Sequence, residues 1–131
     1  MSSTYAAMRI LIVGDGQLVR ARLRMLLLEV GIRQVTWAVS ANAALRSLSD
    51  PGLPLPNAII VEMKSEPGFE VEFYQAVRMH LKQRNVDVPI LLLADTDVVD
   101  VSTLSTQMGD DTILSKRVNR ETLRAWLVEF S

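Results

Sequence analysis

The chain contains no cysteine among its 131 residues, which excludes disulfide bonds, zinc–thiolate sites and cysteine nucleophiles. It also has no apolar run near the ~20 residues that a membrane-spanning helix needs. The apolar run from Ile10 to Val13 is too short to form the core of a signal peptide. These absences favour a cytoplasmic protein that makes no contact with a membrane.

The chain also lacks an excess of either charge, with 14 Lys and Arg against 15 Asp and Glu. No overall field therefore attracts it to nucleic acid. Apolar residues make up 49% of the chain and charged residues 22%, which is typical of a folded globular domain. This length suits one domain, which we expect over residues 8–131, with a flexible tail at residues 1–7.

Short apolar runs alternate with longer amphipathic stretches along the whole chain. Strands are predicted at 8–13, 33–39, 58–62, 90–94 and 112–115. Helices are predicted at 17–30, 41–48, 69–84, 98–108 and from Asn119 onward. Nearly continuous apolar strands indicate burial on both faces, and therefore a parallel sheet with helices on both sides. The predicted fold class is a doubly wound α/β domain.

Helical and strand spacing also predicts which side chains face the core. In the first helix these are Leu18, Ala21, Met25 and Leu28, in a stripe widened by Leu23, Leu26 and Val30. Elsewhere they are Val35, Trp37 and Val39 in the second strand, Phe69, Phe73, Ala76, Val77 and Leu81 in the long helix, and Leu123, Trp126, Leu127 and Phe130 in the last. Ser40 and Asn119 are predicted to cap helices at their N-termini, and Gly31 to end the first helix.

Basic residues gather on the first helix at Arg20, Arg22 and Arg24. Arg20 and Arg24 lie one turn apart and project together. Two interpretations stay open for this surface: a solvated face, or a docking surface for an acidic partner. The only histidine, His80, lies among basic residues of the long helix and is expected on an exposed face.

Polar residues follow the ends of the predicted strands, where open parallel sheets hold their chemistry. Gly14 and Asp15 follow the first strand, Glu62 ends the third, Ala94 ends the fourth and Lys116 follows the fifth. If the first and third strands are neighbours, Asp15 and Glu62 lie side by side, with Lys116 opposite. Such a rim can form a structural Glu62–Lys116 ion pair, hold a hard cation, or stay a set of solvated loop charges.

Phosphate-binding motifs do not account for this rim. The segment Gly14-Asp15-Gly16 begins like a dinucleotide-binding loop, but Val19 stands where the pattern needs a third glycine. Asp15 would also repel a pyrophosphate. The sequence has no GxxxxGK[ST] loop and no GxSxG elbow.

Several segments between Met8 and Phe130 resemble, in order, the receiver domains of two-component response regulators. Residues 10–20 resemble the first strand, the acidic pair and the start of the first helix, and residues 57–62 resemble the segment that ends in the phosphoaccepting aspartate. Residues 88–94 and 109–116 resemble the fourth and fifth strands. The resemblance implies a CheY-like, flavodoxin-like sheet of five strands in the order 2-1-3-4-5.

The chain departs from the family pattern at the positions that hold the metal and accept the phosphoryl group. Two adjacent acids hold magnesium in the family, whereas this chain has Gly14 and then Asp15. Glu62 stands at the position of the phosphoaccepting aspartate and is longer by one methylene. The loss of a ligand oxygen predicts weak or absent magnesium binding, and a displaced carboxylate predicts poor phosphoryl transfer.

The reporter and switch positions also differ from the family. The fourth strand ends in Ala94, where the family has a threonine or serine that contacts the phosphoryl group. The aromatic switch position, three residues before Lys116, is Ile113. Lys116 itself matches the family's lysine. A sharper hypothesis is that Glu62 reaches Lys116 and mimics the phosphorylated aspartate.

Together these features predict a pseudo-receiver: a non-enzymatic module of bacterial signal transduction that needs no cofactor and acts without phosphorylation. Its partner is expected to be another protein or a second copy, bound through the fourth helix, fifth strand and last helix. No nucleic acid is expected to bind this domain. Two alternatives stay open: a working phosphoacceptor that uses Glu62 with Asp15, or a small-ligand-sensing domain of a larger regulator.

Overall fold

A computed structural model of the chain describes residues 7–14, 16–62, 69–84, 88–94, 112–115 and 118–128. The strands are β1 (Arg9–Val13), β2 (Gln34–Ala38), β3 (Ala58–Glu62), β4 (Ile90–Ala94) and β5 (Thr112–Ser115). The helices are α2 (Gln17–Val30), α3 (Ala41–Ser49), α4 (Phe69–Gln83) and α6 (Arg120–Val128). These bounds agree with the predicted elements to within one residue wherever both ends are described. The helix predicted at 98–108 lies outside the described residues.

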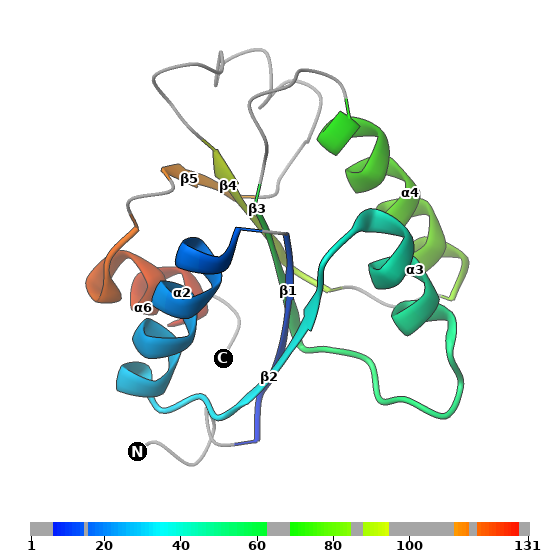
Figure 1. Cartoon of the computed structure of the whole chain (residues 1–131). Coiled ribbons are helices and arrows are strands. Elements are labelled where there is room, and N and C mark those ends of the chain that lie inside the picture. Colours follow the sequence, from blue (N-terminus) through cyan, green and yellow to red (C-terminus); the bar gives the residue numbers. More distant parts are fainter. Residues whose placement is uncertain are drawn as a thin grey trace.

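The described strands form one parallel sheet in the order β2-β1-β3-β4-β5. Helices α2 and α6 cover one face of the sheet, and α3 and α4 cover the other (Figure 1). The predicted doubly wound, flavodoxin-like class is therefore confirmed. Chain order reverses between β1 and β3, so the switch point lies where these two strands end.

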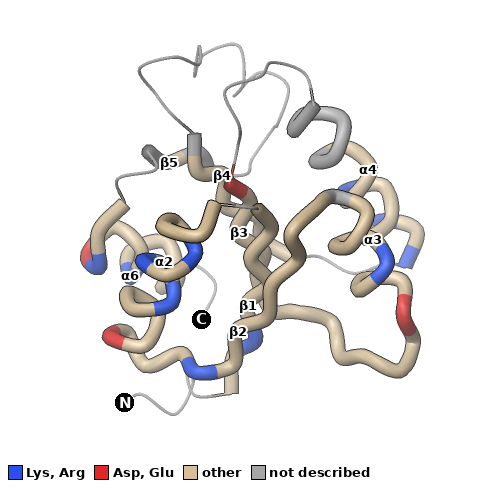
Figure 2. The backbone as a smooth tube through the Cα atoms, in the orientation of Figure 1, with Lys and Arg blue, Asp and Glu red and all other residues tan. Residues whose placement is uncertain are grey.

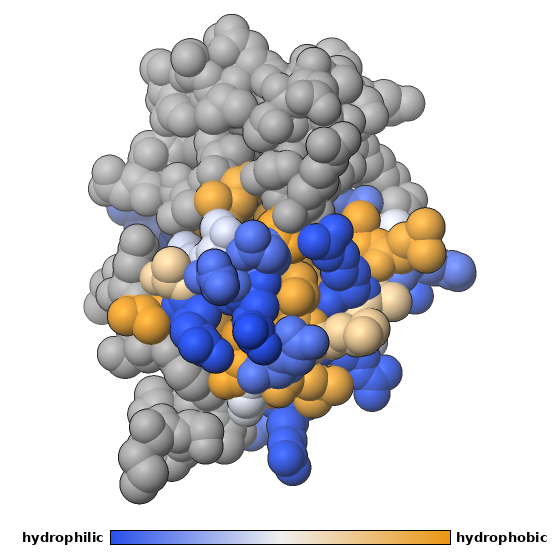
Figure 3. Space-filling model, turned by 90° about the vertical axis from the view of Figure 1, so that its left-hand side faces the viewer, coloured by the Kyte–Doolittle hydropathy of each residue, from blue (hydrophilic) through white to orange (hydrophobic). Residues whose placement is uncertain are grey.

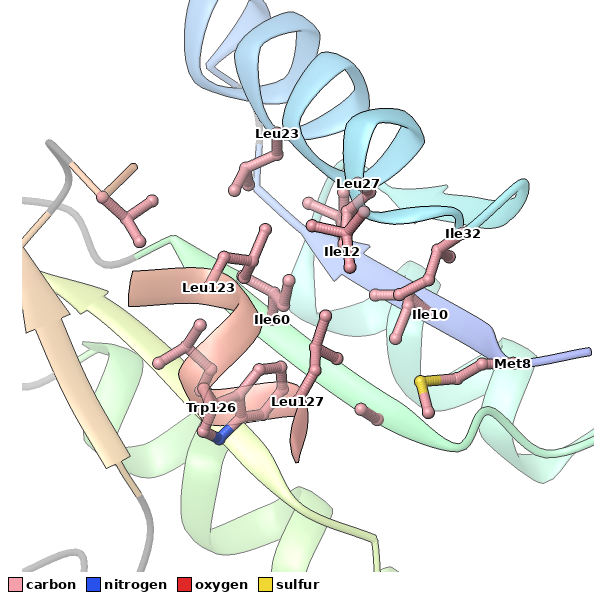
Figure 4. Close-up of a cluster of buried hydrophobic side chains, with 14 of the residues drawn as sticks. Met8, Ile10, Ile12, Leu23, Leu27, Ile32, Ile60, Leu123, Trp126 and Leu127 are labelled. Carbon is pink, nitrogen blue, oxygen red and sulfur yellow. The ribbon is translucent and has the colours of Figure 1, made fainter. Parts of the chain in front are cut away.

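Alternating side chains of the strands feed two separate hydrophobic clusters, one on each face of the sheet. In β1, Leu11 and Val13 pack toward α3 and α4, whereas Ile10 and Ile12 pack toward α2 and α6. Figure 4 shows the second cluster, in which Leu23 and Leu27 from α2 point toward Ile12 of β1. Burial on both faces explains why the strands are nearly continuous apolar runs.

Helix α2 turns a different face to the sheet from the one that the sequence predicted. Its buried side chains are Leu23, Leu27 and Val30. Leu18, Met25 and Leu28, which were expected in the core, are 87%, 64% and 48% exposed. Both stripes recur at helical spacing, so periodicity alone could not choose between them.

A long-range hydrogen bond on the α6 side of α2 agrees with this rotation. The guanidinium of Arg22 donates to the carbonyl oxygen of Val118, just before α6, at 3.0 Å. Arg22 therefore faces α6. The buried leucines Leu23 and Leu27 lie to one side of it, toward the sheet, and Met25 lies to the other side, toward solvent.

Other predicted core positions have mixed outcomes. Val77, Leu81, Leu123, Trp126 and Leu127 are buried, as predicted. Ala76 of α4 is exposed. Val39 is also exposed and Trp37 is only partly covered, because they lie in and directly after β2, which is an edge strand. Phe130 and the side chains of Phe69 and Phe73 lie outside the described parts.

The predicted helix ends are confirmed. The Ser40 hydroxyl accepts from the Ala43 amide at 3.1 Å, and the Asn119 side-chain oxygen accepts from the Thr122 amide at 2.8 Å. Gly31 has a φ of 111°, and its amide donates to the carbonyl of Leu27 at 3.0 Å. Only glycine adopts this left-handed conformation without strain, so it ends α2 where the sequence indicated.

His80 is half-buried, which makes its expected exposed position wrong. Its Nε2 lies 3.3 Å from the carbonyl oxygen of Leu48, near the end of α3. Arg84 donates to the same oxygen at 2.8 Å. The basic end of α4 therefore contacts the C-terminal end of α3. The free carbonyl groups at the end of a helix favour hydrogen-bond donors and positive charge.

None of the helices in the described parts of the chain is both long enough and apolar enough to cross a bilayer.

The observed rotation of α2 is tested by two adjacent leucines, of which Leu27 is fully buried and Leu28 is 48% exposed. We expect Leu27→Ala to lower the free energy of unfolding by about 2–5 kcal/mol, because it leaves a cavity in the core. The matched control Leu28→Ala should cost less than about 1 kcal/mol. Urea unfolding followed by circular dichroism measures both, and the reverse ranking would contradict the observed face.

Candidate functional site

The ends of β1 and β3 meet at the switch point because the two strands are paired in register. Val13 lies opposite Val61, so the next residues of each strand, Gly14 and Glu62, are brought to the same rim. The Gly14 amide donates to the carbonyl of Ala38 at 2.9 Å, which ties the loop after β1 to the end of β2. This loop runs directly into α2.

The Glu62 side chain lies against the backbone of Gly14. A Cβ atom placed on Gly14 would be 2.9 Å from the Cβ of Glu62 and 3.1 Å from its Oε2. The nearer atom is fixed to the β3 backbone, so it cannot move aside without moving the strand. The close approach therefore requires a residue without a side chain at position 14.

The carboxylate of Glu62 continues past Gly14 to Gly16. A Cβ on Gly16 would be 2.6 Å from Oε1 and 2.7 Å from Oε2 of Glu62. Gly16 has a φ of −75° and a ψ of 110°, which other residues adopt freely. A side chain here would displace the carboxylate end of the flexible Glu62 side chain, so glycine at this position serves for space and not for backbone freedom.

The same carboxylate lies at the N-terminus of α2. Gly16 is the N-cap of this helix, which has no side-chain cap and no acidic residue in its first turn. The N-terminus of a helix carries a partial positive charge that favours a nearby anion. Glu62 thus brings from β3 the negative charge that α2 lacks in its own first turn.

The other predicted site residues are placed only in part. The backbone of Ala94 ends β4 and pairs with Ser115, so it lies at the same edge as Glu62, whose partner is Leu93. Ile113 lies two residues before the end of β5, opposite Leu92. The side chains of Ala94 and Ile113 are not described, and Asp15 and Lys116 lie outside the described residues.

The described part of the rim does not fit the magnesium site of a receiver. Gly14 supplies no side-chain oxygen, and the Glu62 carboxylate fills the space beside it. Across the described residues, no group of three or more His, Asp or Glu lies close enough to hold a metal ion.

Sequence reasoning did not assign a role to Gly16. The signal was present: two glycines flank Asp15, and paired glycines mark places where another group approaches the backbone closely. In a dinucleotide loop that group is a pyrophosphate, whereas here it is a carboxylate of the same chain.

No protein-family model and no curated protein matches the chain. Solved structures do match, and several of them are receiver domains. The chemotaxis protein CheY4 of Vibrio cholerae is 25% identical with a TM-score of 0.73, and the match covers 95% of this chain and 100% of that one. The chain thus has the fold of CheY-like receivers.

Two receiver domains of histidine kinases are similar to the same extent. That of CKI1 from Arabidopsis thaliana, complexed with Mg2+ and BeF3−, has 22% identity and a TM-score of 0.75 over 99% of this chain and 95% of that one. That of PA1611 from Pseudomonas aeruginosa, with a magnesium ion in its active-site cleft, has 23% identity and a TM-score of 0.75. The PA1611 match covers 95% of this chain and 98% of that one.

Substitutions at the two glycines test how Glu62 is accommodated. We expect Gly14→Ala to cost about 1–3 kcal/mol of unfolding free energy, and to keep most of that cost beside Glu62→Ala, because the Cβ of residue 62 remains. Gly16→Ser should be destabilising only while Glu62 is present, since the clash is with its carboxylate and serine is otherwise a good N-cap.

A double-mutant cycle measured by chemical unfolding separates the two cases. The coupling of Gly16→Ser with Glu62→Ala should exceed about 0.5 kcal/mol and should be larger than that of Gly14→Ala. A Gly16→Ser variant that is equally stable in both backgrounds would show that the carboxylate does not occupy this place.

Proposed function

We propose that the chain is a receiver-type signalling domain that does not accept a phosphoryl group and acts through protein contacts. The observation that carries the proposal is the placement of Glu62, whose carboxylate lies over Gly14 and Gly16. The receiver fold and the resemblance of the strand ends to response regulators support the signalling role.

The position of Glu62 is unsuited to accepting a phosphoryl group. An acceptor oxygen must face the donor in line, and small displacements of a reacting group cost large factors in rate. Here the carboxylate is instead directed toward the loop after β1 and the N-terminus of α2.

The rim also has no space for an acidic side chain at position 14, where the family has the first of its two acids. An aspartate at position 14 would bring its Cβ to 2.9 Å from that of Glu62, so the two side chains cannot coexist without a shift of β1 or β3. Gly14 and Glu62 are thus one compatible pair, and restoring either acid alone would not restore the family's site. The CKI1 and PA1611 receivers bind magnesium, and this chain is proposed not to.

The remaining departures fit the same proposal. Ala94 has no hydroxyl with which to report a phosphoryl group, and Ile113 lacks a polar group for the switch. Lys116 is proposed to have Glu62 as its charge partner in place of a phosphorylated aspartate. With no chemistry at the rim, the output is proposed to be a protein–protein or dimer contact. The face proposed for it includes the helix predicted at 98–108, the fifth strand β5 and the last helix α6.

Phosphodonor treatment tests the proposal directly. With acetyl phosphate and Mg2+, the intact mass of the native chain should not rise by one phosphoryl group. The CKI1 receiver domain, which has been crystallised with Mg2+ and BeF3−, serves as the comparison protein. Isothermal titration with Mg2+ should give no saturable binding at millimolar concentrations, because a ligand oxygen is missing.

The variant Glu62→Gln tests the alternative in which Glu62 accepts a phosphoryl group. A phosphoryl mass gain in the native chain that Glu62→Gln abolishes would show that Glu62 is an acceptor, as in the alternative of a working receiver. Beryllofluoride bonded to Glu62 in a crystal would contradict the proposal in the same way.

A further inference from the structure

Helix α2 exposes a continuous apolar stripe on the side away from the sheet. Leu18, Ala21, Met25 and Leu28 are spaced three and four residues apart, so they lie on one line along the helix. Leu18 is 87% exposed and Met25 is 64% exposed. We call these four residues, with Arg20 and Arg24 beside them, the α2 outer face.

Arginines border the stripe on the side of β2. The Arg20 guanidinium lies 5.2 Å from the ring centre of Trp37 in β2, which places this arginine between the helix and the edge strand. Arg24 is one turn further along and is exposed. Figure 2 shows the basic positions along α2, and Figure 3 shows hydrophilic and apolar atoms side by side on this face.

On the other side of the stripe, the charged groups are already engaged within the chain. Arg22 donates to the Val118 carbonyl, and Glu29 lies 4.0 Å from Arg120 in a salt bridge. Glu29 is the only acid of α2, against three arginines. The charge left to an incoming partner is therefore positive and comes from Arg20 and Arg24.

The charges of α2 are arranged against the stability of the helix itself. Arg20 lies in the first turn, at the positive end of the helix dipole, and the last turn contains no basic residue. Arg20 and Arg24 are also like charges at i and i+4, which repel. An external acidic group would relieve both effects, whereas helix stability alone explains neither.

We propose that the α2 outer face docks an acidic amphipathic helix of a partner protein. The stripe runs from Leu18 to Leu28, a length of roughly 15 Å at the helical rise, which matches about three turns of a docked helix. Acidic side chains beside the apolar residues of the partner would meet Arg20 and Arg24. This inference names the partner for the proposed interaction role and rests on that role.

A second copy of the chain fits this face poorly. A two-fold axis that crosses the stripe at right angles to α2 keeps Arg20 and Arg24 of both copies on the same side of the interface. Like charges at such an interface oppose association. Charge complementarity therefore favours an acidic partner.

The test uses the whole chain and a labelled synthetic helix of 14 residues, the length of α2, with leucines on one face and glutamates on both flanks. The control peptide has lysine in place of each glutamate. By fluorescence anisotropy, the acidic peptide should bind at least ~10-fold more tightly than the basic one, and added salt should weaken it.

Paired variants locate the binding. Met25→Ser and Arg24→Glu should each weaken the acidic peptide about tenfold, and Arg24→Glu should strengthen the basic peptide. Matched controls on the opposite face of the sheet are Met79→Ser, at a methionine 63% exposed, and Arg46→Glu on α3. These should change affinity less than about twofold.

Several outcomes would overturn the inference. One is equal binding of the two peptides, or no saturable binding of the acidic peptide up to about 1 mM. Another is self-association that Met25→Ser abolishes, which would assign the face to a second copy. A third is binding to phosphatidylserine vesicles that Arg24→Glu abolishes, which would assign it to a membrane.

The outcome of the peptide-binding test is independent of the outcome of the phosphodonor test. A chain that gains a phosphoryl group at Glu62 but still prefers the acidic peptide would refute only the inactive rim. A chain that gains none and does not distinguish the peptides would refute only the docking face.

Discussion

The contact between Glu62 and the glycines after β1 is the constraint on which the rim depends. Parallel pairing of Val13 with Val61 brings the two strand ends together, and the Cβ of Glu62 then leaves no room for a side chain at position 14. Neither strand can shift alone, since each is also hydrogen-bonded to its other neighbour in the sheet. The residue types at positions 14, 16 and 62 are therefore one linked choice.

The extra methylene of a glutamate has a specific structural consequence here. It carries the carboxylate to Gly16, where the charge lies at the uncapped N-terminus of α2. A carboxylate at a helix N-terminus stabilises the helix, which gives the Glu62 side chain a role in the fold. Simple loss of a disused site would predict no such fit, because a drifting position has no reason to be matched by glycines on the neighbouring loop.

The sequence was sufficient for the fold because each level of evidence pointed to the same elements. Apolar strands, the Ser40 and Asn119 caps and the Gly31 terminus all indicated the observed boundaries. It was not sufficient for the rotation of α2. That helix is apolar on two faces, and the observed face is set by contacts with distant segments, among them the hydrogen bond from Arg22 to Val118, 96 residues later in the chain. Contacts of this kind are absent from local periodicity. The role of Gly16 was missed for the same reason, because the carboxylate that needs the space comes from β3.

The rim and the α2 outer face share one helix, and this connects the two proposals physically. In a receiver that is phosphorylated, the acceptor side chain gains negative charge, which changes the electrostatic environment at the carboxyl ends of the strands. Here the carboxylate at the N-terminus of α2 belongs to Glu62 of β3, so it is part of the chain itself and is not added by a phosphodonor. A ligand can shift a protein only between states for which it has different affinities. With this carboxylate built in, the partner proposed for the α2 outer face would meet a single, preorganised surface, and its affinity is proposed not to depend on a phosphodonor.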